Sequence, residues 1–377
     1  MEENLITLAI HTYRQALTVK RILESHGIEV KLEKFTASGT NVVAAIRVKI
    51  KETDLSLALK ITESMDHINI GIDNLLDSSS GKILIPVDLK SYSIRACRMG
   101  FELARRLSLQ PVVLHSYATP YFKGNLADED ISMTGVDTSV ADEAIEMEVE
   151  MDLKSQTQLQ MRQFKKEIEK EQESGNLPKI KFVTVVNEGL PEDVIKEYCR
   201  LTPPELVVMA TRGKKKKDEE MIGSVTAEIL DSCRVPILSI PEEGSLIEIE
   251  KIKKLVFFCG LDQHDILTVD SLMRMFNYPE ADITLIPVNE RAGKNIKEKM
   301  DLLRDYFNRS YPTAHFKTVV LSQKNFIADF NNYEEQAGVE LIIVPNKRRN
   351  VFARLLNPSI AHRLLFERDL PLLAIPV

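Results

Sequence analysis

The stretch MATRGKKKKDEEMIGSVTAEIL, residues 209–230, indicates how this chain is built. It starts at the end of the apolar run 206–209, which is typical of a buried parallel strand. A polar loop with Gly213 follows, and Gly223 and Ser224 then open an expected helix. A helix N-terminus attracts anions, because its first N–H groups are unpaired and its macrodipole is positive there. The stretch therefore predicts a phosphate-binding loop between a strand and a helix.

Length and composition indicate a globular protein of two or three domains, since 377 residues exceed one ordinary core. The chain is 44% hydrophobic and 28% charged, and its net charge of −7 gives no general attraction to nucleic acid or anionic membranes. No apolar run approaches the roughly 20 residues of a membrane helix. The start MEENLITLAI lacks the pattern of a signal peptide. We expect a cytoplasmic protein with neither a nucleic-acid nor a membrane partner.

The positions of cysteine and histidine argue against a metal site. The sequence contains no C-x-x-C pair, and none of its seven histidines has the H-E-x-x-H spacing. Reduced and mostly buried thiols are expected at Cys97, Cys199, Cys233 and Cys259.

The N-terminal region predicts a small α+β domain, residues 1–66, followed by a linker at 67–80. Its expected order is strand, helix, two strands and a helix, which suggests a ferredoxin-like or ACT-like domain. A regulatory, ligand-sensing role and a simple interaction or packing role both remain open for it. The expected elements are Leu5–Ile10, Tyr13–His26, Ile28–Phe35, Ala44–Ile50 and Glu52–Met65.

From Lys82 onward, strands and helices alternate, which predicts a parallel sheet with helices on both faces. The first set, residues 81–243, has expected strands at Ile83–Val87, Pro111–Tyr117, Ile180–Val186, Leu206–Thr211 and Val235–Ile240. Its expected helices are Ser91–Leu107, about 141–173, and Pro191–Leu201.

The same order then repeats in residues 250–377. The segments PPELVVMATRG and GVELIIVPNKR align without a gap, and VPILSIP closely matches LPLLAIP. We therefore predict two tandem five-stranded α/β domains. The second set of expected strands is Lys254–Gly260, Asp282–Val288, Phe316–Leu321, Leu341–Val344 and Leu370–Ile375.

These residues resemble the universal stress protein family in a tandem two-domain form. The nucleotide-binding branch carries G-x2-G-x9-G-[ST] after its fourth strand, and this chain has Ala210, Gly213, Gly223 and Ser224 at that spacing. The family's acidic residue after strand one falls on Asp88. The resemblance implies a Rossmann-like fold of the adenine nucleotide alpha hydrolase type, with strand order 3-2-1-4-5. It also implies a stress-response regulator that binds ATP or a related adenine nucleotide, with Mg²⁺ as a possible companion.

The resemblance also implies how the site is divided. Backbone around Pro86, Val87 and Val113, with the Met209 side chain, would line the adenine pocket. Because a carboxylate repels phosphate, Asp88 should face the ribose or base; its alternative role is a cap on the helix after it. Phosphate would contact Arg212 and the backbone N–H groups of Gly213, Gly223, Ser224 and Val225, together with the Ser224 hydroxyl.

Two departures from the family pattern bear on binding. Ala210 replaces the first glycine, which would cost about 1–2 kcal/mol if that position needs a left-handed backbone and little if it only needs room. Residues 214–217 are four lysines, followed by the acidic run 218–220. The lysines could hold outer phosphates, or the run could be a solvated charged loop.

The second copy lacks the glycines. Its aligned positions are Pro345, Arg348 and Pro358-Ser359, and its nearest carboxylate, Asp262, comes two places late. We predict no nucleotide there. Instead the two copies are expected to pair through their fifth strands, as an internal equivalent of the family's dimer. Whether two whole chains also form a homodimer is left open.

Three functions compete for this chain. The first is an ATP-binding stress regulator, and the second is a scaffold whose site is disabled by Ala210 and the lysine run. The third, an ATP-using enzyme, is disfavoured because the sequence has no Walker A, HIGH, KMSKS or SGGxDS signature. At most, weak ATP hydrolysis is expected.

Overall fold

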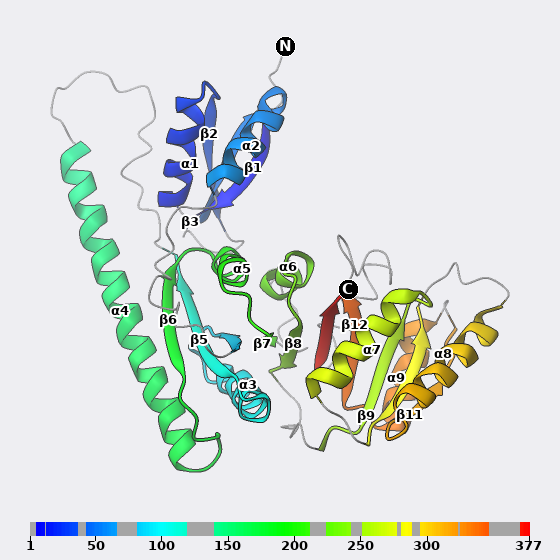
Figure 1. The fold of residues 1–377 in the computed structure, drawn as a ribbon. Coiled ribbons are helices and arrows are strands. Elements are labelled where there is room, and N and C mark those ends of the chain that lie inside the picture. Colours follow the sequence, from blue (N-terminus) through cyan, green and yellow to red (C-terminus); the bar gives the residue numbers. More distant parts are fainter. Residues whose placement is uncertain are drawn as a thin grey trace. The chain divides into compact units, whose positions relative to one another are not determined.

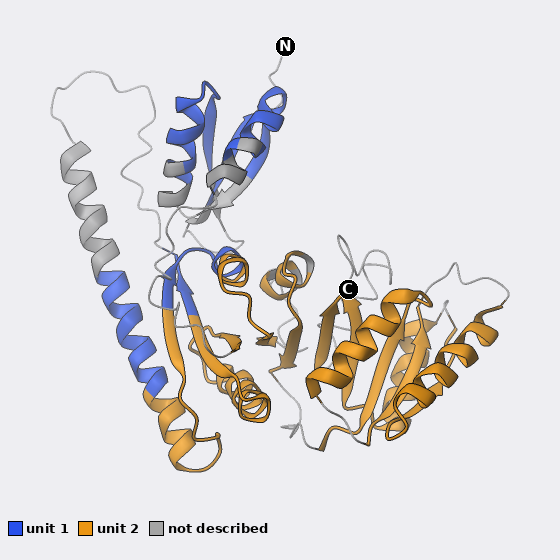
Figure 2. Cartoon of the chain, viewed as in Figure 1, with its two compact units in different colours: residues 1–77, 115–165, 186–194 blue, residues 78–114, 166–185, 195–377 orange. Residues whose placement is uncertain are grey.

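The computed structural model describes residues 5–11, 13–36, 43–65, 81–118, 139–211, 224–242, 251–276, 280–288, 295–322, 325–346 and 370–377. The chain forms two compact units, coloured separately in Figure 2. One contains residues 1–77, 115–165 and 186–194, and the other contains 78–114, 166–185 and 195–377.

The N-terminal part has a three-stranded antiparallel sheet in the order β1-β3-β2. Its elements are β1 (Leu5–His11), α1 (Tyr13–Ser25), β2 (Val30–Thr36), β3 (Val43–Lys51), the short η1 (Glu52–Asp54) and α2 (Leu55–Met65). Both helices bury apolar residues against the sheet, so Leu23, Val48, Ile50 and Ala58 are fully buried. Alternating apolar residues in β3 leave the other positions for ion pairs, such as Lys49 with Glu33 on β2.

A ten-stranded sheet carries the rest of the fold (Figure 1), in the order β11-β10-β9-β12-β13-β8-β7-β4-β5-β6. The earlier strands are β4 (Lys82–Pro86), β5 (Gln110–Tyr117), β6 (Val183–Glu188), β7 (Leu206–Thr211) and β8 (Ile237–Pro241). The later ones are β9 (Lys254–Cys259), β10 (Asp282–Pro287), β11 (His315–Thr318), β12 (Leu341–Asn346) and β13 (Leu372–Pro376). This large, mostly parallel sheet confirms the α/β class expected from the sequence.

The order within each set of five strands is the same. Numbered within its set, each reads 3-2-1-4-5 from the outer edge inward. The two fifth strands meet at the centre, where β8 and β13 pair antiparallel with Leu373 opposite Leu238. The Ser239 hydroxyl also donates to the Leu372 carbonyl across this junction, at 3.3 Å.

The helices between the strands are amphipathic and bury their apolar faces on the sheet. Residues of α3 such as Cys97, Phe101 and Ala104 are almost completely buried. The helices are α3 (Ser93–Leu107), α4 (Ser139–Glu173), α5 (Pro191–Leu201), α6 (Ser224–Ser232), α7 (Gln263–Phe276), α8 (Ile296–Ser310) and α9 (Phe326–Ala337). Among the described residues, no helix is long and apolar enough to cross a membrane.

Four strands begin later than the sequence suggested: β2, β8 and β13 by two residues and β6 by three. We expected Ile180–Val186, whereas β6 runs from Val183 to Glu188. The side-chain amide of Gln172 donates to the carbonyls of Pro178 and Ile180, at 2.7 and 2.9 Å. These bonds to α4 satisfy carbonyls that would otherwise need strand partners, so the sheet begins further along the chain.

Candidate functional site

The carboxyl ends of β4 and β7 lie side by side and form the candidate site. β4 pairs with β5 on one side and with β7 on the other, with Ile83 opposite Leu206 and Leu84 opposite Val207. In a doubly wound sheet, ligands bind beyond the strand ends at the point where the strand order reverses, which is between β4 and β7 here. Asp88 follows β4, and β7 ends at Thr211.

Asp88 is exposed and organises the turn between β4 and α3. Its Oδ1 accepts hydrogen bonds from the Ser93 hydroxyl at 2.7 Å and from the Lys90 backbone N–H at 3.2 Å. Its Oδ2 accepts a hydrogen bond from the Tyr92 hydroxyl. Within the same turn, Leu89 has a left-handed backbone with φ of 60°. The side chain therefore orders the turn before α3 but accepts no backbone N–H of that helix, which begins at Ser93 rather than at Ser91 and has no side-chain cap from the described residues.

Tyr92 and Ser93 were missed by sequence reasoning. Both follow Asp88 within five residues, and Ser93 is 2% exposed. An aspartate followed by serine and tyrosine just before a helix is a local turn signal that could have indicated them.

The residues expected around adenine lie together at the same strand ends. Pro86 ends β4, and the Val87 N–H donates to the Leu114 carbonyl at 2.8 Å, which holds it against β5. Val113 is completely buried, and Met209 is 4% exposed. Because their side chains are packed in the core, they offer a ligand little surface of their own.

The loop between β7 and α6 is only partly described. Arg212, Gly213 and Gly223 lie outside the described residues, as does the lysine run 214–217. Ser224 is the first residue of α6, and the next residue, Val225, is half-buried. The structure thus places the start of α6 but not the expected phosphate contacts.

Ala210 belongs to β7 and pairs with Ile240 of β8. A paired strand residue has an extended backbone. The cost of a left-handed alanine therefore does not arise here, and the remaining question is whether its methyl group leaves room for a ligand.

The corresponding turn of the second set has different chemistry. Leu261 has φ of 59° and matches Leu89, so Gly260 occupies the position of Asp88. The carboxylate has moved to Asp265, which is completely buried and accepts from the Gly260 N–H at 3.0 Å. No side chain projects from the position of Asp88 in this copy.

Two buried thiols lie close together, one on α5 and one directly after α6. Cys199 on α5 and Cys233 after α6 are hydrogen-bonded to each other. This bond lowers the pKa of Cys233, and it raises that of Cys199 together with burial. The Lys196 ammonium of α5 also forms an ion pair with Glu228 of α6. Among the described residues, no cluster of histidine, cysteine or acidic side chains could hold a metal ion.

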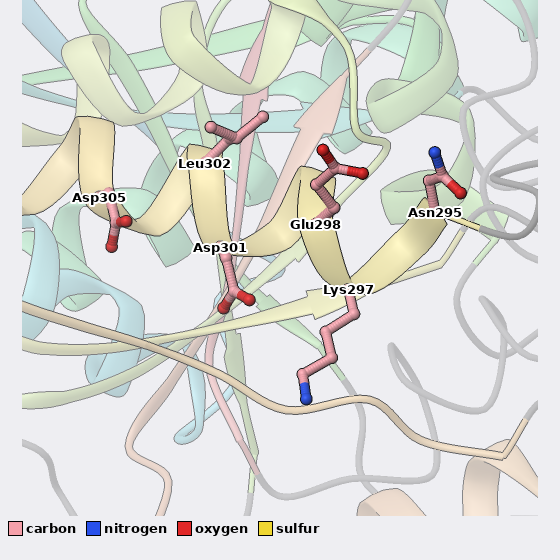
Figure 3. A pocket seen from close by; sticks show the side chains of 6 residues that line it. All are labelled: Asn295, Lys297, Glu298, Asp301, Leu302 and Asp305. Carbon is pink, nitrogen blue, oxygen red and sulfur yellow. The ribbon is translucent and has the colours of Figure 1, made fainter.

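A separate shallow pocket lies on α8 (Figure 3), and its lining does not suit a nucleotide. Three of its side chains are carboxylates, which repel phosphate. Two of these, Asp301 and Asp305, form ion pairs with Arg304 at 2.7 and 2.8 Å. The full lining is Asn295, Lys297, Glu298, Asp301, Leu302 and Asp305.

The strand order defines a doubly wound α/β protein. In such proteins ligands bind where the strand order reverses, which is between β4 and β7 here. Residues 80–241 match the model of the Universal stress protein family. A universal stress protein of Methanocaldococcus jannaschii is 24% identical over 159 residues, 42% of this chain and 81% of that protein. Together these matches support universal stress protein family membership for this segment.

Solved structures were also compared with the chain. A universal stress protein from Archaeoglobus fulgidus has a TM-score of 0.46 at 11% identity, covering 79% of this chain and 99% of its own. Universal stress protein UspA from Lactobacillus plantarum has a TM-score of 0.27 at 16% identity, covering 44% of this chain and 99% of its own.

Proposed function

We propose that this chain is a cytoplasmic stress-response regulator that binds ATP or a related adenine nucleotide between β4 and β7. The observation that carries the proposal is the parallel pairing of β7 with β4, the strand that Asp88 follows, at the reversal of strand order. The start of α6 at Ser224 supplies a helix N-terminus on the chain segment that follows β7. The match of residues 80–241 to the universal stress protein family supports the same site.

The roles of the site residues follow from charge. Asp88 would accept hydrogen bonds from ribose hydroxyls with the lone pairs that Ser93, Lys90 and Tyr92 leave open. Gly213, Gly223, Ser224 and Val225 would give backbone N–H groups to phosphate, and Arg212 would add a positive charge. Any Mg²⁺ would arrive with the phosphates, because these ions bind through substrate oxygens and few carboxylates.

The second candidate is a scaffold that binds no nucleotide. The contacts of Asp88 favour it, because this carboxylate already has the structural task of ordering the turn between β4 and α3. Dedicated catalysis lies behind both candidates, and at most weak ATP hydrolysis is expected.

The wider organisation is part of the proposal. The two sets of five strands would be tandem copies of one domain, paired through β8 and β13 as an internal pseudo-dimer. The second copy would bind no nucleotide, since Gly260 stands where Asp88 stands in the first. Residues 1–66 would be a ferredoxin-like regulatory domain joined by the linker 67–80.

Mass spectrometry of the freshly purified, denatured protein tests the proposal by detecting bound adenine nucleotide. Calorimetry with Mg-ATP then compares the wild type with Ser224→Ala and with Ser359→Ala, the matched position of the second copy. We expect Ser224→Ala to weaken binding about three- to tenfold, as for one lost hydrogen bond, and Ser359→Ala to leave it unchanged. If neither method detects nucleotide on the wild type, the scaffold is the correct function.

A further inference from the structure

The helix that begins at the candidate phosphate loop is tied at its other end to the second set of strands. The side chain of Asn346, the last residue of β12, donates from Nδ2 to the Leu230 carbonyl of α6 at 2.7 Å. Both residues are buried, with exposed fractions of 2% and 1%. The direction of this bond is certain from chemistry, because a carbonyl can only accept and the amide nitrogen can only donate.

The bond satisfies a group that helix geometry leaves open. The last four carbonyls of a helix have no partner within it, and Leu230 lies in the last turn of α6. Its neighbours find local donors, since the Ile229 carbonyl accepts from the Cys233 N–H and the Glu228 carbonyl from the Ser232 hydroxyl. The Leu230 carbonyl instead receives its donor from a residue 116 positions away in sequence.

α6 needs such contacts to hold its direction. It has nine residues, and helices this short are marginal on their own. Its C-terminal half is held by buried Ile229 and Leu230 and by the ion pair of Glu228 with Lys196 of α5, while Thr226 is buried in its first half. Once α6 is formed, its nine residues are little more than two turns, so the position of its last turn determines where its first N–H groups point.

The first set of strands does not use the matching residue in this way. Thr211 aligns with Asn346, and its hydroxyl donates to Ile240 on the neighbouring strand of its own set, at 3.3 Å. The Asn346 side chain carries an amide in place of the threonine hydroxyl, and this amide reaches α6 of the other set. Its Oδ1 is buried and has no hydrogen-bond partner among the described residues, so its Nδ2 contact is the one that orients the side chain.

We infer that Asn346 is a positioning residue, through which the second set of strands orients α6 and thereby sets nucleotide affinity in the first. This inference rests on the proposed function. It gives the second set of strands a regulatory role toward nucleotide binding in the first set. A partner or signal that displaced the end of β12 would change affinity without touching the nucleotide.

Two variants remove the donor while keeping the volume: Asn346→Leu leaves an apolar group, and Asn346→Asp faces the Leu230 carbonyl with negative charge. The matched control is Arg106→Met. Arg106 Nη2 donates to the carbonyl of Phe276, the last residue of α7, at 2.6 Å. Like the Asn346 bond, this hydrogen bond runs from a side chain of one set to the C-terminal end of a helix in the other set. It does not involve α6.

Two measurements on the full chain test the inference. Calorimetry with Mg-ATP should give about tenfold weaker binding for both Asn346 variants, equivalent to about 1.4 kcal/mol, and a change below about twofold for Arg106→Met. Hydrogen exchange without nucleotide should be faster in α6 for the Asn346 variants alone. Thermal unfolding identifies the temperature at which all variants are folded, and both measurements are made below it.

The outcomes separate the inference from the function on which it rests. If the wild type binds no ATP, the proposed function fails, while exchange in α6 still tests the orienting contact. If α6 exchanges at the wild-type rate in both Asn346 variants, or if Arg106→Met loses as much affinity as they do, the inference is wrong.

Discussion

Leu89 and Leu261 share a left-handed backbone, with φ of 60° and 59°, at the same place after the first strand of each set. The pair aligns the two turns residue by residue and shows that Asp88 corresponds to Gly260. In the second set, Asp265 is buried at the position of Ser93, and Asp262 is exposed at the position of Lys90. The exposed carboxylate of this turn therefore lies two positions later in the second set than in the first.

The left-handed turn predicts a ranking of stability for substitutions at Leu89. Glycine and asparagine tolerate this backbone, whereas a β-branched residue resists it. We expect Leu89→Gly and Leu89→Asn to stay within about 1 kcal/mol of the wild type, and Leu89→Val to lose at least about 1 kcal/mol more. Urea unfolding measures this, and the same three changes at Leu261 are the control. A valine as stable as glycine at both positions would contradict the argument.

The close packing of α3 on β4 predicts a coupled pair. A Cβ added at Gly100 would lie 2.5 Å from Cδ1 of Ile85, which is completely buried. Overpacking costs about 1–3 kcal/mol, and the better helix propensity of alanine returns up to about 1, so Gly100→Ala should lower the unfolding free energy by about 1–2 kcal/mol.

Ile85→Val removes Cδ1, the nearer of the two Ile85 atoms in the way, and leaves Cγ1 at 2.9 Å, so the double variant should lose less than the sum of the two single changes. A double-mutant cycle by urea unfolding measures this coupling. Strict additivity would mean that the helix shifts instead.

The hydrogen bond between Cys199 and Cys233 predicts which thiol reacts first. Because the bond lowers the pKa of Cys233, its thiolate is present at lower pH than those of Cys97 and Cys259, whose pKa values are raised by burial. We expect iodoacetamide to label Cys233 fastest, as measured by peptide mass spectrometry between pH 7 and 9.

Cys199→Ala removes the largest cause of the lowered pKa, so the pH profile of Cys233 labelling should move to higher pH. Cys97→Ala is the control and should leave the profile in place. Equal labelling of all four thiols would contradict the prediction.

Tyr198 predicts a loss of stability at alkaline pH. Burial raises its pKa to about 12 from 10.0, so the folded state holds its proton more tightly than the unfolded state. The resulting stability is fully present below pH 10 and is lost as pH rises through 12, by about 2–3 kcal/mol. Tyrosinate absorbance and unfolding between pH 9 and 12 measure it.

Tyr198→Phe should abolish this alkaline step. At pH 7 it should be neutral or slightly stabilising, since the Tyr198 hydroxyl is buried and has no hydrogen-bond partner in the described part of the chain. A large loss of stability at pH 7 would show that the hydroxyl has a structural role.

Much of the fold could be predicted from the sequence because its signals are local. Apolar runs and helical periodicity place α5 and β7 at their observed bounds. The glycine spacing after β7 and the acidic residue after β4 indicate the family, which the match of residues 80–241 supports. The start of β6 was predicted wrongly because the side chain of Gln172 decides it from α4.

The contacts around the candidate site were decided by the tertiary structure. The equivalence of Leu89 with Leu261 and the hydrogen bond of Asn346 to Leu230 have no signal strong enough to be predicted locally. Periodicity reports which face of a segment is apolar, because it depends only on the residue types along that segment. A hydrogen bond between distant segments depends on how the strands pair and where the helices end, and only folding determines that.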